Sequence, residues 1–286
     1  MKPAPFEYFA PGELDAALDL LAEHGEEGKV LAGGQSLVPA MNFRLARPQS
    51  LIDINRIAAL DYVGEADGRL QIGALARHAR FEAPVAAGAL GALLPRIARH
   101  IAHWPIRVRG TFAGSLAHAD PASEWCLLAA TLDAEMVAAS CGGTRVLKAQ
   151  EFFLGALTTA LAGDELLTEI RLPLLGEEWR AGFVEFSRRA GDFALAMCAA
   201  FLHFENGRVV AARIGVGGAT DRPLRSAAAE AILIGSDGES DAGRAAADAA
   251  AQAIEHPLED LHADAEYRRD LVRAMAERAI AQACGR

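Results

Sequence analysis

The chain has 286 residues, more than one compact core usually contains, so we expect two domains. Hydrophobic residues make up 52% and charged residues 23%, a composition that supplies ample material for a globular core. The net charge of −10 argues against a nucleic-acid partner, because an acidic surface repels a phosphate backbone.

Targeting and cysteine signals are also informative. No apolar run is long enough to span a bilayer, and Met1 to Glu7 lack the apolar core of a signal peptide. We therefore expect a cytoplasmic protein without a transmembrane segment. The four cysteines are scattered and show no CxxC spacing, which indicates reduced thiols and argues against an iron–sulfur or zinc site with the usual ligand spacing.

The first half of the chain alternates between helix and strand patterns. Leu14, Leu18 and Leu21 have helical spacing and predict a helix over 11–24 that ends at Gly25. A βαβ-like unit then follows from a strand at 29–32, a turn or short helix at 39–45 and a strand at 50–54. A second unit has strands near 70–72, 135–139 and 168–172, and helices near 93–102 and 125–132. Asp120 is a candidate N-cap for the last of these helices, with Pro121 at its first position.

A charged turn near 174–178 separates this half from the second. Beyond it, Asn206 and Gly207 join apolar runs at 199–204 and 208–216, which is a strong signal for a β-hairpin. Alanine-rich helices are predicted over 226–233, 242–254 and 266–283. The fold class is therefore α+β. We expect one domain at 1–175, with subdomains at about 1–55 and 56–175, and a second domain at 176–286, an antiparallel sheet with helices.

Two glycine-rich loops, Leu31–Leu37 and Arg109–Leu116, are the most informative motifs. Each follows an apolar, strand-like run and precedes a segment that can restart as a helix. Glycine lets the backbone approach a ligand closely, and exposed N–H groups with small hydroxyls suit a pyrophosphate. A single double glycine is usually a tight turn, but the recurrence and the hydroxyls of Ser36, Thr111 and Ser115 favour a nucleotide cofactor held between two subdomains.

Other patterns favour structural interpretations. The glycines at 215–218 follow a strand, but Thr220 holds the place of the third glycine of a dinucleotide fingerprint, so we interpret them as a structural turn. His100, His103 and His118 have no HExxH motif or carboxylate in register, so we expect no metal in this chain. A nucleophilic hydrolase has no motif support, since GxSxG and a spaced Cys–His pair are missing. From composition alone, 188–193 reads as a charged turn.

Three segments together resemble a known family: Ala32–Leu37, Ile106–Pro121 and Gly191–Ala194. They are similar to the FAD-binding medium subunit of molybdenum hydroxylases, relatives of carbon monoxide, nicotine and quinoline dehydrogenases and of the flavin domain of xanthine dehydrogenase. The resemblance covers essentially the whole chain, with the motifs in the family's order. It implies a vanillyl-alcohol-oxidase (PCMH)-type FAD-binding domain of two subdomains, followed by a C-terminal domain like that of the carbon monoxide dehydrogenase flavoprotein.

The resemblance also implies roles for individual residues. The pyrophosphate would be bound by Ala32, Gly33, Gly34, Gln35, Ser36, Thr111, Gly114 and Ser115. Glu124 would bind the ribose end, Ile101 and Leu161 would make apolar contacts, and Phe193 would lie near the isoalloxazine. The implied FAD site further includes Lys29, Val30, Leu31, Leu37, Ala117, Asp120 and Arg189. Many relatives carry a Lys shortly before the Gly-Asp motif, and here Ser187 stands there, with Arg188 or Arg189 as sources of positive charge.

The implied reaction needs partners, because no acid–base pair, nucleophile or metal cluster is visible in the sequence and the cofactor would carry the chemistry. Electrons would pass from a molybdenum cofactor on a large subunit, through two [2Fe–2S] clusters on a small subunit, to this FAD and an external acceptor. The assembly would be a dimer of heterotrimers. Gln35 and the overall sequence look closer to the N-heterocycle dehydrogenases than to carbon monoxide dehydrogenase, and this resemblance implies an N-heterocycle substrate rather than carbon monoxide or an aldehyde. Two alternatives remain open: a stand-alone FAD-dependent oxidase or dehydrogenase, and a scaffold that has lost FAD, for which damaged glycine loops would be expected.

Overall fold

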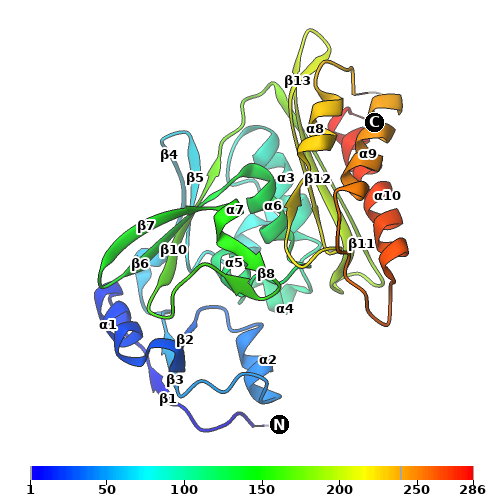
Figure 1. Ribbon diagram of the computed structural model, residues 1–286. Coiled ribbons are helices and arrows are strands. Elements are labelled where there is room, and N and C mark those ends of the chain that lie inside the picture. Colours follow the sequence, from blue (N-terminus) through cyan, green and yellow to red (C-terminus); the bar gives the residue numbers. More distant parts are fainter. Residues whose placement is uncertain (1, 239, 286) are drawn as a thin grey trace.

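The computed structural model describes residues 2–238 and 240–285, which form three units, each built on its own sheet (Figure 1). We call them the N-terminal unit (2–55), the middle unit (56–175) and the C-terminal unit (176–285). The middle unit lies between the other two (Figure 1). None of the helices within the described residues is both long and apolar enough to cross a membrane.

The N-terminal unit is a small parallel sheet with one flanking helix. Its strands have the order β1-β3-β2, and their bounds are β1 Glu7–Phe9, β2 Gly28–Leu31 and β3 Ser50–Asp53. Helix α1 (Leu14–His24) buries Ala17, Leu18 and Leu21 and ends at Gly25, whose φ is +51°. The predicted helix and both predicted strands are therefore confirmed. A short helix, α2 (Leu37–Asn42), follows the first glycine loop.

The middle unit contains an antiparallel sheet of five strands in the order β4-β5-β10-β6-β7. Their bounds are β4 Val63–Ala66, β5 Arg69–Gly73, β6 Glu135–Ser140, β7 Gly143–Lys148 and β10 Leu166–Pro173. The helices of this unit are α3 Gly88–Ala98, α4 Trp104–Arg107, α5 Phe112–His118, α6 Glu124–Leu132 and α7 Ala149–Phe152. A two-stranded hairpin is formed by β8 Phe153–Gly155 and β9 Thr158–Thr159. Phe81, Phe112 and Trp125 are completely buried in its core, where Phe112 stacks on Trp125 and Phe81 contacts both rings in tilted orientations.

Two expectations around the second glycine loop were wrong. The loop follows the helical turn α4 and not a strand, because Pro105 stands in the first turn of a segment that continues as helix to Arg107. Helix α6 is capped by Ser123 and not by Asp120: the Ser123 Oγ accepts a hydrogen bond from the Cys126 N–H. Asp120 instead closes the preceding turn, where its carboxylate accepts from the Ala122 N–H at 2.8 Å.

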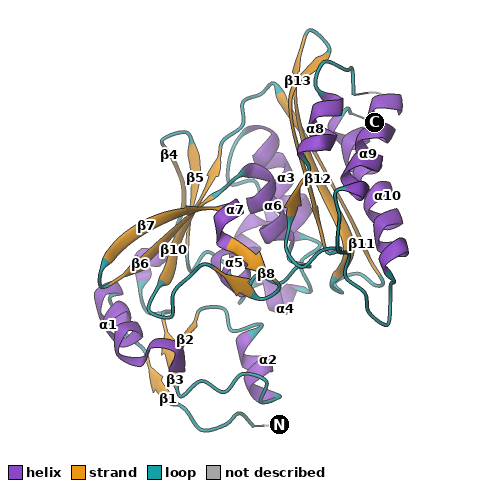
Figure 2. Ribbon diagram, in the orientation of Figure 1, coloured by secondary structure: helices purple, strands orange, loops and turns teal. Residues whose placement is uncertain are grey.

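The C-terminal unit has an antiparallel sheet in the order β11-β12-β13-β14, with helices covering one face (Figure 2). The bounds are β11 Trp179–Ser187, β12 Ala194–Glu205, β13 Arg208–Gly217, β14 Leu224–Arg225, α8 Ala227–Leu233, α9 Ser240–Gln252 and α10 Ala265–Ala283. Asn206 and Gly207 have φ values of +50° and +76°, so the predicted hairpin turn is confirmed.

The sheet of the C-terminal unit is buried on both faces. Helix α10 packs on β11 and β12 from one side, while α3 and α6 of the middle unit pack on β11, β12 and β13 from the other. Close approach depends on glycine at two places. A Cβ at Gly182 would lie 2.0 Å from the Ala279 carbonyl oxygen, and one at Gly215 would lie 1.8 Å from the Thr131 Oγ1. The glycines at 215–218 are thus structural, as expected, although Gly215 and Gly217 belong to β13.

Candidate cofactor site between the two glycine loops

A cavity of about 570 Å³ lies where the N-terminal unit meets the middle unit, and both glycine loops line it. This volume is within the range of about 300–1,000 Å³ that small-molecule sites occupy. The predicted site residues that line it are Lys29, Val30, Leu31, Ala32, Gly33, Gly34, Gln35, Ser36, Leu37, Thr111, Gly114, Ser115, Ala117 and Leu161. The fold therefore brings together segments that are about a domain's length apart in the sequence.

The two glycine loops touch each other through their backbones. A Cβ at Gly33 would lie 2.6 Å from the Arg109 carbonyl oxygen and 2.6 Å from the Gly110 Cα, so only glycine fits there. Gly34 has a φ of +71°, which favours glycine as well. The Gln35 side chain closes back on the loop and donates to the Gly33 carbonyl at 3.0 Å. In the second loop, the Gly114 N–H donates to the Thr111 Oγ1 at 2.9 Å, which makes Thr111 the cap of α5.

Hydrogen bonds from Asn55 and Arg77 join the two loops, and we call this pair of residues the Asn55–Arg77 clip. The Asn55 Nδ2 donates to the Ala32 carbonyl of the first loop at 2.9 Å. Arg77, which comes from the middle unit, donates both to the Asn55 Oδ1 and to the Arg109 carbonyl of the second loop. Sequence reasoning missed Arg77 and Asn55, because each is a single polar residue outside any motif. Their positions show that the relative placement of the loops is maintained by hydrogen bonds across the two units.

His78 also lines the cavity and was missed as well. Its side chain is only 4% exposed, and its Nδ1 accepts a hydrogen bond from the Trp125 Nε1 at 3.0 Å. Burial, together with the charges of Arg77 and Arg107, lowers the pKa of His78 to about 4. The ring is therefore neutral at neutral pH. Its sequence context, between Arg77 and Arg80, gave no signal of a buried position.

The remaining predicted site residues lie outside the lining of the cavity: Ile101, Asp120, Glu124, Arg189 and Phe193. Ile101 lies in the turn between α3 and α4, where the Arg107 guanidinium donates to its carbonyl at 3.1 Å. The loop that contains Phe193 packs against the same turn, since a Cβ at Gly191 would lie 2.5 Å from the His103 Cε1. The structure thus brings the 189–193 loop beside Ile101. The Phe193 side chain is 76% exposed there.

Glu124 lies near a second acid, Glu185, whose side chain is only 1% exposed. The His100 Nδ1 is 3.6 Å from the Glu185 Oε2, and that oxygen has no hydrogen-bond partner in the described part of the chain. Burial raises the pKa of Glu185 to about 7. Burial and repulsion by Glu185 raise the pKa of Glu124 well above its usual range. Protonation of this pair is therefore coupled, and full ionisation of both acids is unfavourable.

Ser187 stands at the position of the family's Lys, Arg188 and Arg189 were the two candidates for its positive charge, and the three residues differ in the structure. The Ser187 Oγ donates to the Arg189 carbonyl at 3.0 Å, which tightens the start of the loop. The Arg188 guanidinium contacts the His262 Nδ1 at 2.8 Å. Arg189 is exposed.

No group of three or more His, Cys, Asp or Glu side chains that could hold a metal ion occurs within residues 2–238 and 240–285.

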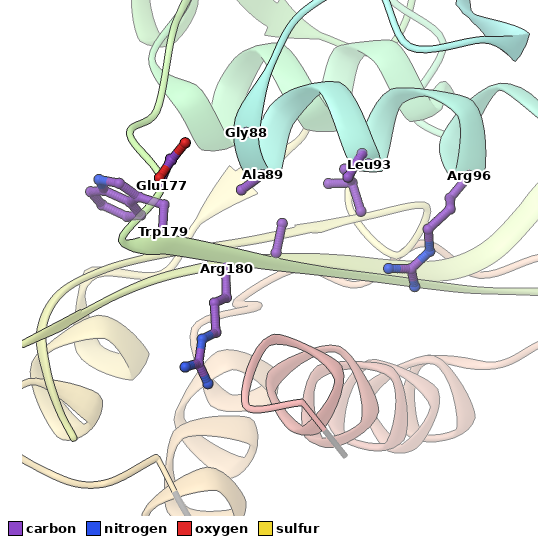
Figure 3. Close-up of a pocket in the computed structure, with 9 residues that line it drawn as sticks. Gly88, Ala89, Leu93, Arg96, Glu177, Trp179 and Arg180 are labelled. Carbon is purple, nitrogen blue, oxygen red and sulfur yellow. The ribbon is translucent and has the colours of Figure 1, made fainter.

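A second cavity, of about 380 Å³, lies between α3 and β11 (Figure 3). The two arginines that line it already contact other residues of the chain. The Arg96 guanidinium donates to Gln282, and the Arg180 guanidinium lies 4.8 Å from the Phe204 ring centroid, on the side of the strand away from α3 (Figure 3). None of the predicted site residues, all of which the structure describes, lines this second cavity. The cavity between the glycine loops is therefore the candidate cofactor site.

The donor set of this cavity fits a dinucleotide. Glycines at the contact of the loops leave the backbone open to a ligand, and hydroxyls of Ser36, Thr111 and Ser115 stand in or beside them. Outside the loops, the wall includes the apolar side chains of Leu21, Ile54 and Leu161 as well as charged ones such as Glu26 and Glu165. The apolar part of this wall suits the ring systems of a flavin dinucleotide, while the loops suit its pyrophosphate.

Comparison with known proteins agrees with this fit. Residues 4–175 match the family model of the FAD binding domain in molybdopterin dehydrogenase, and residues 181–283 match that of the CO dehydrogenase flavoprotein C-terminal domain. The chain is 40% identical to the 6-hydroxypseudooxynicotine dehydrogenase complex subunit alpha of Paenarthrobacter nicotinovorans, over 100% of this chain and 97% of that protein. It is 38% identical to the nicotine 6-hydroxylase medium subunit of the same organism, over the full length of both.

A solved structure agrees with the fold as well. Carbon monoxide dehydrogenase from Hydrogenophaga pseudoflava superposes with a TM-score of 0.95 at 37% identity, covering 100% of this chain and 99% of that chain. The expected fold class, an α+β FAD-binding domain of this type followed by a flavoprotein C-terminal domain, is confirmed.

Proposed function

The chain belongs to the FAD-binding medium subunits of the molybdenum hydroxylases, and from that premise we propose that it receives electrons from iron–sulfur clusters of a partner subunit and passes them to an external acceptor. The observation that carries the proposal is the cavity between the two glycine loops. When bound there, FAD supplies the electron-accepting and electron-donating chemistry. The chain itself binds, orients and shields the cofactor.

The residues divide into three groups by position. The loops, Ala32 to Ser36 with Thr111, Gly114 and Ser115, bind the pyrophosphate. Lys29, Val30, Leu31, Leu37, Ala117 and Leu161 form the surrounding wall. The third group lies outside the lining of the cavity: Glu124 binds the ribose end, Ile101 makes apolar contact, and Asp120 and Arg189 complete the site. The exposed Phe193 ring is available to cover the isoalloxazine. We further propose two domains, 1–175 with subdomains at about 1–55 and 56–175, and 176–286.

We propose that the holoenzyme contains two other kinds of subunit. A small subunit carries two [2Fe–2S] clusters and a large subunit carries the molybdenum cofactor, in a dimer of heterotrimers. The designations "medium subunit" and "complex subunit alpha" of the two relatives support an assembly of several different chains. An N-heterocycle is the proposed substrate class of the assembly, and the nicotine-related names of both relatives support it.

The test is the visible absorption spectrum of the complex, purified gently from its native source, with metal analysis of the same sample. We expect flavin bands overlaid by iron–sulfur absorption, with molybdenum present. Flavin bands without metal in an intact complex would instead identify a self-contained flavoenzyme. A colourless chain that takes up no added FAD would overturn the proposal as a whole.

A further inference from the structure

The His78 ring is fixed in one tautomer by its surroundings. The Trp125 indole N–H can only donate, so the His78 Nδ1 must accept, at 3.0 Å and in a buried position. Because burial lowers the pKa of His78 to about 4, the ring is neutral at neutral pH and carries a single proton. That proton is therefore on Nε2.

The Nε2–H group faces the second glycine loop. A Cβ at Gly110 would lie 2.5 Å from the Nε2, so this nitrogen is next to the loop backbone, and both residues line the cavity. No acceptor within the described residues forms a hydrogen bond with Nε2. The donor is therefore available to an oxygen of a molecule in the cavity that His78 lines.

The position of the donor indicates which oxygen it meets. The backbone N–H of His78 donates to the Gly110 carbonyl at 3.0 Å, and the guanidinium of the neighbouring Arg77 donates to the Arg109 carbonyl. His78 is thus attached to the second loop next to the contact with Gly33 of the first loop. We propose that the His78 Nε2–H is a hydrogen-bond donor to the pyrophosphate of the bound dinucleotide. This inference rests on the proposed function, because it takes FAD as the ligand of the cavity.

The Trp125 contact fixes both the tautomer and the orientation of the His78 ring. A free neutral imidazole divides its proton between two nitrogens, and a protonated one would add a charge that varies with pH. With Trp125 as its partner, His78 presents a neutral donor in a constant orientation over the whole range above its pKa. His78 is accordingly a binding residue without a role in proton transfer.

The first experiment uses the wild-type full chain labelled with ¹⁵N-histidine and observes the His78 Nε2–H resonance by NMR. The probes are FAD, ADP, which has a pyrophosphate without the flavin, and riboflavin, which has the flavin without phosphate. We expect the resonance to move, and its exchange with water to slow, with FAD and with ADP but not with riboflavin. A resonance that FAD leaves unchanged, although flavin fluorescence shows binding, would overturn this inference alone. Absence of any FAD binding would instead overturn the proposed function.

The second experiment measures the FAD dissociation constant of His78→Phe and His78→Gln. The Phe variant retains a ring of similar size without a donor, and we expect its affinity for FAD and for ADP to fall about 10- to 100-fold, the value of one hydrogen bond to a charged group. Gln supplies an N–H donor and should recover part of the loss. His203→Gln, in the C-terminal unit, is the matched control. Equal affinity of folded His78→Phe and wild type would contradict the inference; if that variant does not fold, the NMR result decides.

Discussion

The two glycine loops contribute to one cavity but are anchored differently. The second loop continues into the core of the middle unit, where Thr111, Phe112 and Ala113 are almost completely buried. The first loop belongs to a three-stranded sheet, and the segment after it exposes Phe43 and Leu45. The first loop is joined to the second by the Asn55–Arg77 clip and by backbone contact at Gly33. Changes in the second loop should therefore affect folding, while changes in the first should affect mainly the cofactor.

Phe112→Ala should show the largest effect. Phe112 is completely buried and stacks on Trp125 with ring centroids 4.6 Å apart, so its truncation leaves a cavity in the core. We expect a loss of about 3–5 kcal/mol in the free energy of unfolding, measured by urea denaturation of the apoprotein. Leu37→Ala, at the corresponding place after the first loop, is only partly buried and should cost much less. Equal losses would contradict the comparison.

Acid should weaken the region of the second loop through His78. In the unfolded chain His78 binds a proton below about pH 6.5, whereas in the folded chain it does so only below a pKa of about 4. The stability contributed by the neutral ring is present above pH 6.5 and is lost as the pH falls from 6.5 to 4, by roughly 3 kcal/mol in total. Unfolding free energies of wild type and His78→Gln across this range give the measurement. A constant difference between the two proteins would show that His78 is not responsible.

Gly33→Ala should separate cofactor binding from folding. The new Cβ would meet the Arg109 carbonyl and the Gly110 Cα at 2.6 Å, so the loops must move apart. Overpacking of this kind introduces about 1–3 kcal/mol of strain at the contact between the loops. Because both loops line the cofactor cavity, we expect about a 10- to 100-fold loss of FAD affinity in a fluorescence titration. Gly64→Ala is the control, because a Cβ there meets no described atom within 4 Å. Unchanged affinity for FAD would show that close contact of the loops is not required.

Capping should give the smallest difference. Thr111→Val retains the branched shape but removes the acceptor of the Gly114 N–H, so we expect a loss of about 1 kcal/mol in unfolding free energy. Ser36 holds the corresponding place before α2, yet its side chain accepts no capping hydrogen bond within the described chain. Ser36→Ala should consequently leave the thermal unfolding midpoint of the apoprotein almost unchanged. A larger shift for Ser36→Ala than for Thr111→Val would reverse the comparison.

Local patterns predicted much of this fold, and contacts between distant segments account for the failures. The leucine spacing of 14–21 and the Asn206-Gly207 pair are self-contained signals, and both were interpreted correctly. Strand β11 was missed because its sequence mixes Arg180 and Glu185 with apolar residues, and its burial comes from α3 and α10, far away in the chain. Asp120 and Ser123 are both good N-cap residues by type, and only the local geometry shows that Asp120 binds the Ala122 N–H while Ser123 caps the helix.

The cavity itself illustrates the same limit. Glycine and hydroxyl residues predicted the two loops, and the structure places both loops around one cavity. Arg77, Asn55 and His78 carry no such signal, since an isolated Arg, Asn or His is usually solvated or structural. Their importance comes only from partners in another unit or in the core, such as Ala32 and Trp125. The sequence predicted the glycine loops that line the cavity, but not the polar residues that hold these loops in place.

The double burial of β12 has a consequence for synthesis on the ribosome. One face of that strand needs α6, which is translated before it, whereas the other face needs α10, which is translated after it. The nascent C-terminal sheet therefore meets a surface that is already available, and it keeps its opposite apolar face open until residues 265–283 have left the exit tunnel. During that interval the exposed strand is a target for chaperones and for aggregation. Docking of a single late helix ends this vulnerable period.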